Sequence, residues 1–230
     1  MSGAAPKLTA ESPALAPPLA RAPVGPPGTH EERAHRDVPL AEQPRRASYA
    51  DLEAVPEGKV AELVDGELYV FPRPAVPHAH AASGLGADLM GPFQRGRGGP
   101  GGWLFLDEPE LHFAHPAHPE IEALVPDLAG WRRERMPEIP TGAFITLPPD
   151  WLCEVLSPST RVHDRERKMA VYARHEVRWA WLLDPIEKTL EVFTREDARW
   201  GEARLYQGDA TVRVIPFDAV ELDLALLWAR

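Results

Sequence analysis

A single carboxylate inside an apolar run places the strongest constraint on how this chain can fold. The run is DWLCEVLS, residues 150–157, and Glu154 lies at its centre. Alternate side chains of a strand share a face, so Glu154 interrupts a face that Leu152 and Leu156 otherwise make apolar. An ionised carboxylate is rarely buried unless it is paired or binds a metal. We therefore expect either an internal salt bridge or a metal site at Glu154.

The segment that follows, residues 159–175, is rich in charges but keeps a helical spacing. Asp164, Lys168 and Tyr172 follow one another at intervals of four, so a helix places them along one face. A chain that leaves the strand and returns as this helix can bring Lys168 back to Glu154. The alternative is an ordinary surface pair between Asp164 and Lys168, with the lysine in solvent.

Two further carboxylates occupy unusual positions in the sequence. Asp127 follows Pro126 in the segment ALVPDL, and proline tends to end a central strand or to mark a bulge. We expect Asp127 at an edge of the sheet, where it either serves a site or caps a loop. Glu62 lies between apolar neighbours in AELVDGEL, and either a metal-binding or a supporting role is open for it.

Hydrophobic periodicity and turn residues divide the chain into alternating helices and strands. Ser48 and Asp51 form a capping box for a short helix, and Asp65-Gly66 marks a two-residue hairpin turn. The other expected elements are a helix over 78–93, a strand pair within 103–113, a strand that runs into the Pro126-Asp127 step, the strand over 150–157, the helix over 159–175, a hairpin across Asp184-Pro185 and a terminal strand within 212–228. This order predicts an α/β fold, bordering on α+β, around one mixed sheet flanked by helices.

Residues 1–45 are rich in proline and alanine and show no sustained period. Such a composition cannot bury enough apolar surface to offset its ordering entropy, so we expect a disordered extension followed by one folded domain over residues 46–230. Cys153 is the only cysteine, which excludes an internal disulfide. Because neither a signal peptide nor a membrane span is visible, the expected location is the cytoplasm.

The formal net charge of −10 bears on the class of partner. It argues against a protein that coats nucleic acid with a broad basic surface. It is compatible with a local metal site, because a bound cation offsets its acidic ligands. Arg161 and Arg165 lie near Lys168 in the sequence and are candidate phosphate contacts, although a solvated helix face is the commoner meaning of such a run.

Asp127, Glu154 and Lys168 together would define a specific chemistry. Two carboxylates form a hard oxygen site that suits Mg²⁺, with waters and a backbone oxygen such as that of Val155 completing the shell. The metal would polarise a phosphoryl oxygen and activate water, and the ammonium would stabilise the charge that builds on the phosphate. The predicted reaction is hydrolysis of a phosphodiester without a covalent intermediate.

The chain resembles the Uma2 family (DUF820) of the restriction-endonuclease-like, PD-(D/E)xK superfamily. The matching segments occur in family order over about residues 48–194: YADLEAVPE, AELVDGELYV, VPDL, CEVLSPST, DRERKMAVYARHEVRWAWLLDP and TLEVF. The most distinctive part is EVLSPST followed by Asp164, Lys168, Tyr172 and W-x-x-D-P, whereas the lone PD is not distinctive.

The resemblance implies roles for individual residues. Asp127 and Glu154 match the metal-binding carboxylates. The simple superfamily motif has its lysine two residues after the glutamate, where this chain has a leucine, and Lys168 matches the family's migrated lysine on the next helix. Glu62 matches an N-terminal acidic residue that supports the metal. His80 matches a family histidine that touches substrate or the site acids, with a capping or packing role as its alternative.

The implied activity is that of a Mg²⁺-dependent endonuclease acting on DNA, with Mn²⁺ able to substitute. A homodimer is expected by analogy with nucleases of this fold that pair to cut two strands. The alternative is a catalytically silent nuclease fold that serves as a binding or regulatory module. A zinc site at His112, His115 and His118 is disfavoured because prolines interrupt the segment, which is expected to be a solvated loop.

Overall fold

The structure, a computed structural model, describes residues 46–117, 119 and 121–228. The expected disordered extension over residues 1–45 and the side chain of His118 lie outside the described residues. No helix within the described ranges combines the length and the apolar character that a membrane crossing requires.

Strands outnumber helices in the described chain. The helical elements are α1 (Tyr49–Glu53), α2 (Val76–Leu89) with a π-helical extension (Met90–Gln94), a π-helical turn (His163–Lys168) leading into α3 (Met169–Arg174), and a 3-10 turn (Leu224–Leu226). The strands are β1 (Lys59–Val64), β2 (Glu67–Pro72), β3 (Trp103–Asp107), β4 (Leu111–Ala114), β5 (Ile121–Leu124), β6 (Leu128–Arg132), β7 (Trp151–Val155), β8 (Trp179–Asp184), β9 (Thr189–Glu196), β10 (Arg199–Trp200), β11 (Arg204–Gln207), β12 (Thr211–Val212) and β13 (Leu222–Asp223).

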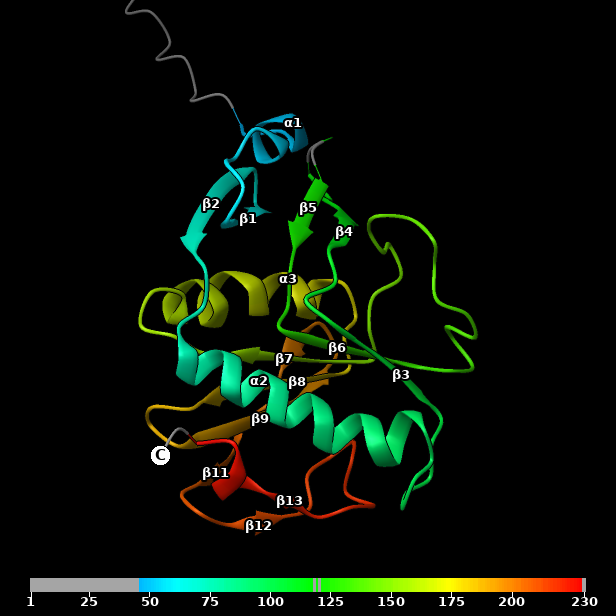
Figure 1. The fold of residues 1–230 in the computed structure, drawn as a ribbon. Coiled ribbons are helices and arrows are strands. Elements are labelled where there is room, and N and C mark those ends of the chain that lie inside the picture. Colours follow the sequence, from blue (N-terminus) through cyan, green and yellow to red (C-terminus); the bar gives the residue numbers. More distant parts are fainter. Residues whose placement is uncertain (1–45, 118, 120, 229–230) are drawn as a thin grey trace, which may run out of the picture. The chain divides into compact units, whose positions relative to one another are not determined.

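The larger sheet is mixed, as predicted. Its strands follow the order β10-β9-β8-β7-β6-β3, and β11 also pairs with β9. Strands β7 and β8 run parallel, whereas the other neighbours are antiparallel. A parallel pair needs a crossover connection, which the π-helical turn and α3 provide between these two strands (Figure 1). The predicted α/β class is confirmed.

Among the described residues, a four-stranded sheet and the two-stranded pair β12-β13 correct the expectation of a single sheet. The four-stranded sheet, called the smaller sheet below, has the strand order β2-β1-β5-β4. The segment 103–113 was expected to form a strand pair, but its two strands, β3 and β4, do not pair with each other. Strand β3 pairs with β6 in the larger sheet, and β4 pairs with β5 in the smaller one.

Strands β3, β4, β5 and β6 form one long hairpin that bends between the larger and the smaller sheet. The ladder pairs Asp107 with Leu128 on one side of the bend and Leu111 with Leu124 on the other. Between them, the Glu108 amide donates to the Asp127 carbonyl at 3.1 Å. Each arm contains a proline at the bend, Pro109 in one arm and Pro126 in the other. Because proline cannot donate to a ladder, the regular pairing of both arms in the larger sheet ends at this point.

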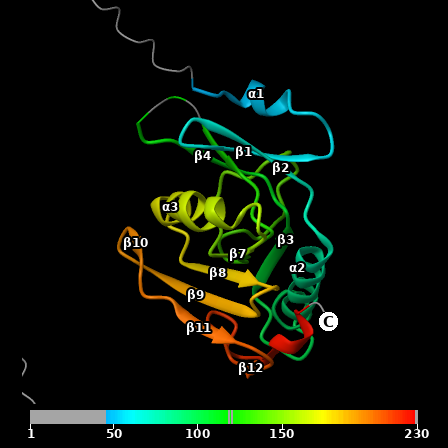
Figure 2. The ribbon, with the colours of Figure 1, turned by 90° about the vertical axis from the view of Figure 1, so that its left-hand side faces the viewer.

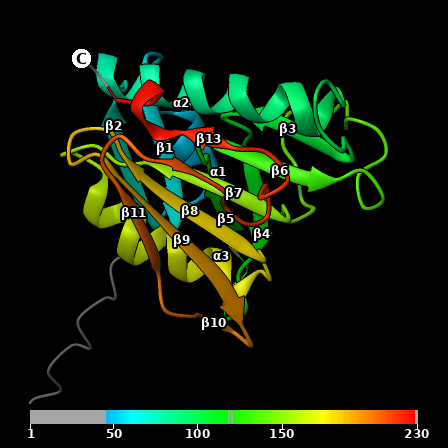
Figure 3. The ribbon, with the colours of Figure 1, turned by 90° about the horizontal axis from the view of Figure 1, so that it is seen from below.

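The larger sheet has an apolar core on each face. Trp151 and Val155 of β7 point into the core that includes α2, whereas Leu152 points into the core that includes α3. Figure 3 shows α2 and α3 on opposite sides of this sheet. Leu124 of the smaller sheet joins the second core, so α3 lies between the two sheets (Figure 2). The predicted alternation along β7 is confirmed.

Local signals in the sequence were reliable at turns and caps. The Ser48 amide donates to the Asp51 carboxylate at 2.7 Å, as expected of a capping box. Asp65 and Gly66 adopt φ values of 52° and 79° at the β1–β2 turn, which are the left-handed values that a tight hairpin turn requires. The expected helix over 159–175 begins at residue 161, and its middle part, His163–Lys168, is π-helical.

The close packing of the larger sheet around Gly130 gives a test of the fold. Gly130 lies opposite Phe105 on one side and Trp151 on the other, and a Cβ there would come within 2.9 Å and 3.2 Å of their rings. We expect Gly130→Ala to lower the free energy of unfolding by about 1–3 kcal/mol, because the rings must move. Exposed Gly142→Ala is the control, since the nearest atom would lie at 3.6 Å. Equal stabilities of the two variants in urea would contradict this packing.

Candidate active site

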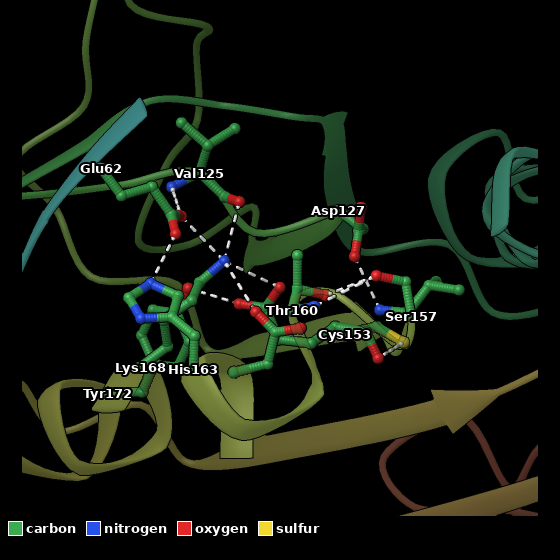
Figure 4. A network of polar contacts seen from close by, with 12 residues as sticks. Glu62, Val125, Asp127, Cys153, Ser157, Thr160, His163, Lys168 and Tyr172 are labelled. Carbon is green, nitrogen blue, oxygen red and sulfur yellow. Dashed lines mark hydrogen bonds and ion pairs between the residues drawn. The ribbon is translucent and has the colours of Figure 1, made fainter. Parts of the chain in front are cut away.

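Four side chains predicted as catalytic line a single cavity of about 270 Å³. Figure 4 shows the polar contacts of this region, with Glu62, Asp127 and Lys168 labelled. Glu62 comes from β1, Asp127 from the link between β5 and β6, Glu154 from β7, and Lys168 from the end of the π-helical turn. The cavity therefore lies where the two sheets meet, beside the bend of the long hairpin. Helix α3 follows Lys168 directly, so the position of the helix sets the position of the ammonium.

Lys168 is the centre of the polar network. Its ammonium lies 2.8 Å from Glu62 Oε1 and donates at 3.0 Å both to Glu154 Oε2 and to the Val125 carbonyl. An ammonium has three donors, and these contacts occupy all of them. Asp164 is more distant, at 3.7 Å, and the lysine side chain is only 3 % exposed. The alternative of a solvated surface pair between Asp164 and Lys168 is wrong.

Glu154 is buried and has a partner at each oxygen. Tyr172 donates its hydroxyl proton to Oε1 at 2.6 Å, and Lys168 donates to Oε2. Lys168 and Tyr172, which the predicted four-residue spacing places on one face of the helix, therefore both bind the Glu154 carboxyl. Burial raises the pKa of the Glu154 carboxyl well above its usual range, although the charge of Lys168 acts in the opposite direction.

Glu62 is held ionised by a different set of contacts. Its Oε1 accepts from the Val125 amide at 2.8 Å, and its Oε2 lies 2.9 Å from His163 Nε2. Burial alone would raise the pKa of Glu62, but Lys168 and these hydrogen bonds outweigh it and lower the pKa. Burial likewise opposes the charge of Lys168, yet Glu154 and Glu62 raise its pKa well above the usual value. Of the two carboxyls paired with Lys168, Glu62 therefore has the lowered pKa and Glu154 the raised one.

Asp127 is oriented by contacts to both of its oxygens. The Val155 amide donates to Oδ2 at 2.6 Å, and His78 Nε2 lies 3.0 Å from Oδ1. Although burial lowers the pKa of His78, its hydrogen bond to Asp127 and the charge of that carboxylate raise it overall. Asp127 thus lies between the end of β7 and the start of α2, with its carboxylate at the wall of the cavity.

The histidine at the site acids is His78 and not His80, which the sequence analysis had selected. His80 is exposed, and its Nε2 lies 3.1 Å from the Leu226 carbonyl. Residues two apart on a helix lie on nearly opposite sides, so only one of the two can face Asp127. The signal was present in the sequence, because His78 continues the three- and four-residue spacing of the buried face of α2 at Ala81, Leu85 and Leu89.

Arg161 and Arg165, the candidate phosphate contacts, are both engaged in ion pairs. Arg161 pairs with Asp184 at the β8–β9 turn, and Arg165 forms a two-pronged pair with Glu191 of β9. Neither arginine lines the cavity that contains the acids. Their proposed contact with substrate stays a prediction.

The cavity can supply oxygen ligands for a cation, but few of them. No three His, Cys, Asp or Glu side chains that line it bring ligand atoms within 4.8 Å of one another, as far as the structure describes the chain. A cation here would rest on Asp127 and Glu154, with backbone or solvent oxygens completing its shell. Hard oxygen donors of this kind suit Mg²⁺.

A separate group of possible ligands consists of Asp65, His115 and Glu122. Arg174 donates to Glu122 at 2.6 Å and to Asp65 at 3.2 Å, so a guanidinium already supplies positive charge there. His112, which was expected in a solvated loop with His115, is buried in β4 and lies 2.6 Å from a Glu110 oxygen. In the histidine-rich segment, His112 therefore pairs with Glu110 and His115 with Asp65 at the smaller sheet.

Comparison with known proteins places the chain among nuclease-like sequences. The family model Uma2, described as "Putative restriction endonuclease", matches residues 46–225. A protein from Anabaena variabilis ATCC 29413, whose crystal structure is described as that of "a putative nuclease belonging to DUF820", aligns with a TM-score of 0.60 at 22 % identity, covering 79 % of this chain and 97 % of that one. At this identity the likeness shows the fold. No curated protein matches the chain significantly.

The buried position of Lys168 gives a test of the network. We expect Lys168→Met to lower the free energy of unfolding by about 3–5 kcal/mol, because removing one partner leaves a buried charge uncompensated. Glu62 has a lowered pKa in the folded protein, so its contribution is present above the usual carboxyl pKa and is lost as the pH falls. In urea unfolding, the free energy of unfolding of Lys168→Met should therefore differ more from that of the parent at neutral pH than at acidic pH.

The matched control for this substitution is Lys188→Met. Lys188 lies 3.9 Å from Asp209, and the two side chains are 49 % and 69 % exposed. Surface pairs of this kind contribute less than about 1 kcal/mol. Equal costs for the two lysines would show that the buried network does not stabilise the fold.

Proposed function

The chain belongs to the Uma2 family, and from this premise we propose that it is a Mg²⁺-dependent endonuclease that hydrolyses phosphodiester bonds in DNA. The observation that carries the proposal is the meeting of Asp127 and Glu154, from two separate strand ends, at one cavity that also contains Lys168. DNA is proposed as the substrate because the family model is described as "Putative restriction endonuclease".

The donor set fits Mg²⁺, with Mn²⁺ able to replace it. Asp127 and Glu154 are hard oxygen donors, and each oxygen keeps a lone pair beyond the contacts already described. Bound there, the cation would polarise a phosphoryl oxygen and lower the pKa of a water. The carbonyl of Val155, which adjoins Glu154 in the chain, is the backbone oxygen proposed to complete the shell.

The protein residues hold this arrangement in place. The Val155 amide and His78 orient Asp127 from both sides, and supporting contacts of this kind set the direction of a ligand. Lys168 keeps Glu154 and Glu62 at the cavity wall. Its positive charge also lies near the position where negative charge builds on a phosphate during hydrolysis. Because its three donors are engaged, we assign Lys168 first to positioning Glu154.

Cleavage of DNA by the purified chain tests this function. With Mg²⁺ present, the parent protein is expected to cut, and Asp127→Asn and Glu154→Gln are each expected to reduce the rate by more than about 100-fold. Both changes preserve shape and remove an ionisable ligand. Asp209→Asn, at a side chain that is 69 % exposed, is the control. If both site variants cut as fast as the parent, the assignment of the two carboxylates is wrong.

The raised pKa of Glu154 gives a second, independent test. A proton stays on this carboxyl above the usual carboxyl pKa, so a cation must displace it. The affinity for Mg²⁺ is therefore expected to rise with pH, by up to about tenfold per unit while Glu154 is protonated. Calorimetric titration in buffers of different ionisation heat should detect the released proton. A pH-independent Kd without proton release would contradict the role of Glu154.

One observation supports a second candidate function, a catalytically silent module. Every donor of Lys168 already binds a protein group, so the network is satisfied without a cation. A silent module would bind no Mg²⁺ through Asp127 and Glu154. The same calorimetric titration therefore separates the two functions, since binding that both Asp127→Asn and Glu154→Gln abolish is expected only of the nuclease.

A further inference from the structure

We propose that the cavity receives one unpaired nucleotide, so that the substrate is a single-stranded or locally unpaired stretch of DNA and not an intact duplex. The inference rests on the proposed nuclease function and names the class of substrate for the same site. It follows from the composition of the cavity walls, the size of the cavity and the small number of cations that line it.

An apolar wall adjoins the acidic residues directly. Val60 and Glu62 share a face of β1, because they are two residues apart in a strand. Phe71 of β2 lies opposite Val60 in the ladder, so its ring is on the same face. Both apolar side chains line the cavity together with Glu62. A group bound beside the carboxylates therefore meets an aromatic ring within the same cavity.

The rest of the lining separates into an apolar and a polar part. The apolar part is completed by Pro72, Pro74, Ala75 and Pro158. Ser157, Ser159 and Thr160, which follow β7, add hydroxyl groups on the side of Glu154. A nucleotide has a similar division, with a flat base whose faces stack on apolar surfaces and a polar sugar-phosphate. Its base fits the wall at Phe71 and its phosphate the acidic side, where the cation would bind.

The size of the cavity fits one such group. Its volume of about 270 Å³ is close to the lower limit of roughly 300 Å³ for pockets that enclose small organic ligands. A paired base cannot enter a pocket of this size, because its partner strand accompanies it. Enzymes that act on a base in a pocket take it out of the stack or use single strands, and unpairing costs least where the base is already unpaired.

The described residues that line the cavity offer few cations for contacts with a duplex. Duplex binding depends on many phosphate contacts from Lys and Arg. Of the described residues that line the cavity, only Arg73 and Lys168 carry a permanent positive charge, and Lys168 is buried and paired. Arg73 is exposed and free of hydrogen bonds and ion pairs to other described residues, so it can contact one phosphate. Binding of a single strand also draws on stacking of bases on aromatic rings, which contributes about 1–3 kcal/mol per base.

Binding of labelled oligonucleotides to the full chain tests the inference. Fluorescence anisotropy is measured with Ca²⁺ in place of Mg²⁺, using one sequence as a single strand, as a perfect duplex and as a duplex with a short unpaired bulge. The single strand and the bulged duplex are expected to bind at least about tenfold more tightly than the perfect duplex. Equal or tighter binding of the perfect duplex, or no binding of any of the three, would overturn the inference.

Variants of Phe71 assign the preference to the wall of the cavity. Phe71→Leu keeps the wall apolar but removes the ring, and it is expected to weaken single-strand binding by about tenfold while duplex binding stays unchanged. Because the ring also lies 5.0 Å from His163, circular dichroism must show an unchanged fold. Phe144→Leu, at a ring that is 43 % exposed and outside the cavity, is the matched control. Unchanged single-strand binding by a folded Phe71→Leu variant would exclude stacking on this ring.

Cleavage of the same three oligonucleotides with Mg²⁺ separates this inference from the proposed function. A single-strand preference in binding without any cleavage would reject the nuclease and retain the nucleotide-binding cavity. Cleavage of the perfect duplex as fast as the single strand would retain the nuclease and reject the unpaired substrate.

Discussion

The buried contacts of Lys168 with Glu62 and Glu154 connect the main parts of the described domain. Glu62 belongs to the smaller sheet, Glu154 to the larger sheet, and Lys168 to the helical segment between them. Apolar side chains of similar volume would often stabilise such a position equally well or better, because burying charges has a large desolvation cost. The network is therefore better explained by what it positions, namely a protonatable carboxyl at the wall of a cavity.

The bend of the long hairpin explains why the site forms where it does. Pro109 and Pro126 end regular pairing at the same level of the two arms, and the chain continues into a second sheet. Asp127 follows the bend immediately, and the end of β7 supplies the amide that orients it. A continuous hairpin would have kept these residues within a flat ladder. The bend opens space between the sheets and directs a carboxylate into it.

The acidic composition of the chain is compatible with the proposed chemistry. The positive charge that a phosphate requires would come from a cation on Asp127 and Glu154, supported by Lys168, and not from a basic surface. Arg161 and Arg165 are paired with Asp184 and Glu191, so neither is a free cation beside the site. For the proposed function, such a site would select its substrate more through the walls of the cavity than through long-range attraction.

The sequence by itself determined the features that depend on local spacing. The apolar run around Glu154, the two faces of β7, the Asp65-Gly66 turn and the four-residue spacing to Lys168 and Tyr172 could all be predicted, because strand and helix periods alone decide which side chains share a face. Only the tertiary structure brought His78 to Asp127, divided the strands among separate sheets, and showed that Lys168 binds Glu62 as well as Glu154. These features depend on the phase of a helix against its neighbour and on pairing between distant segments, which no local period specifies.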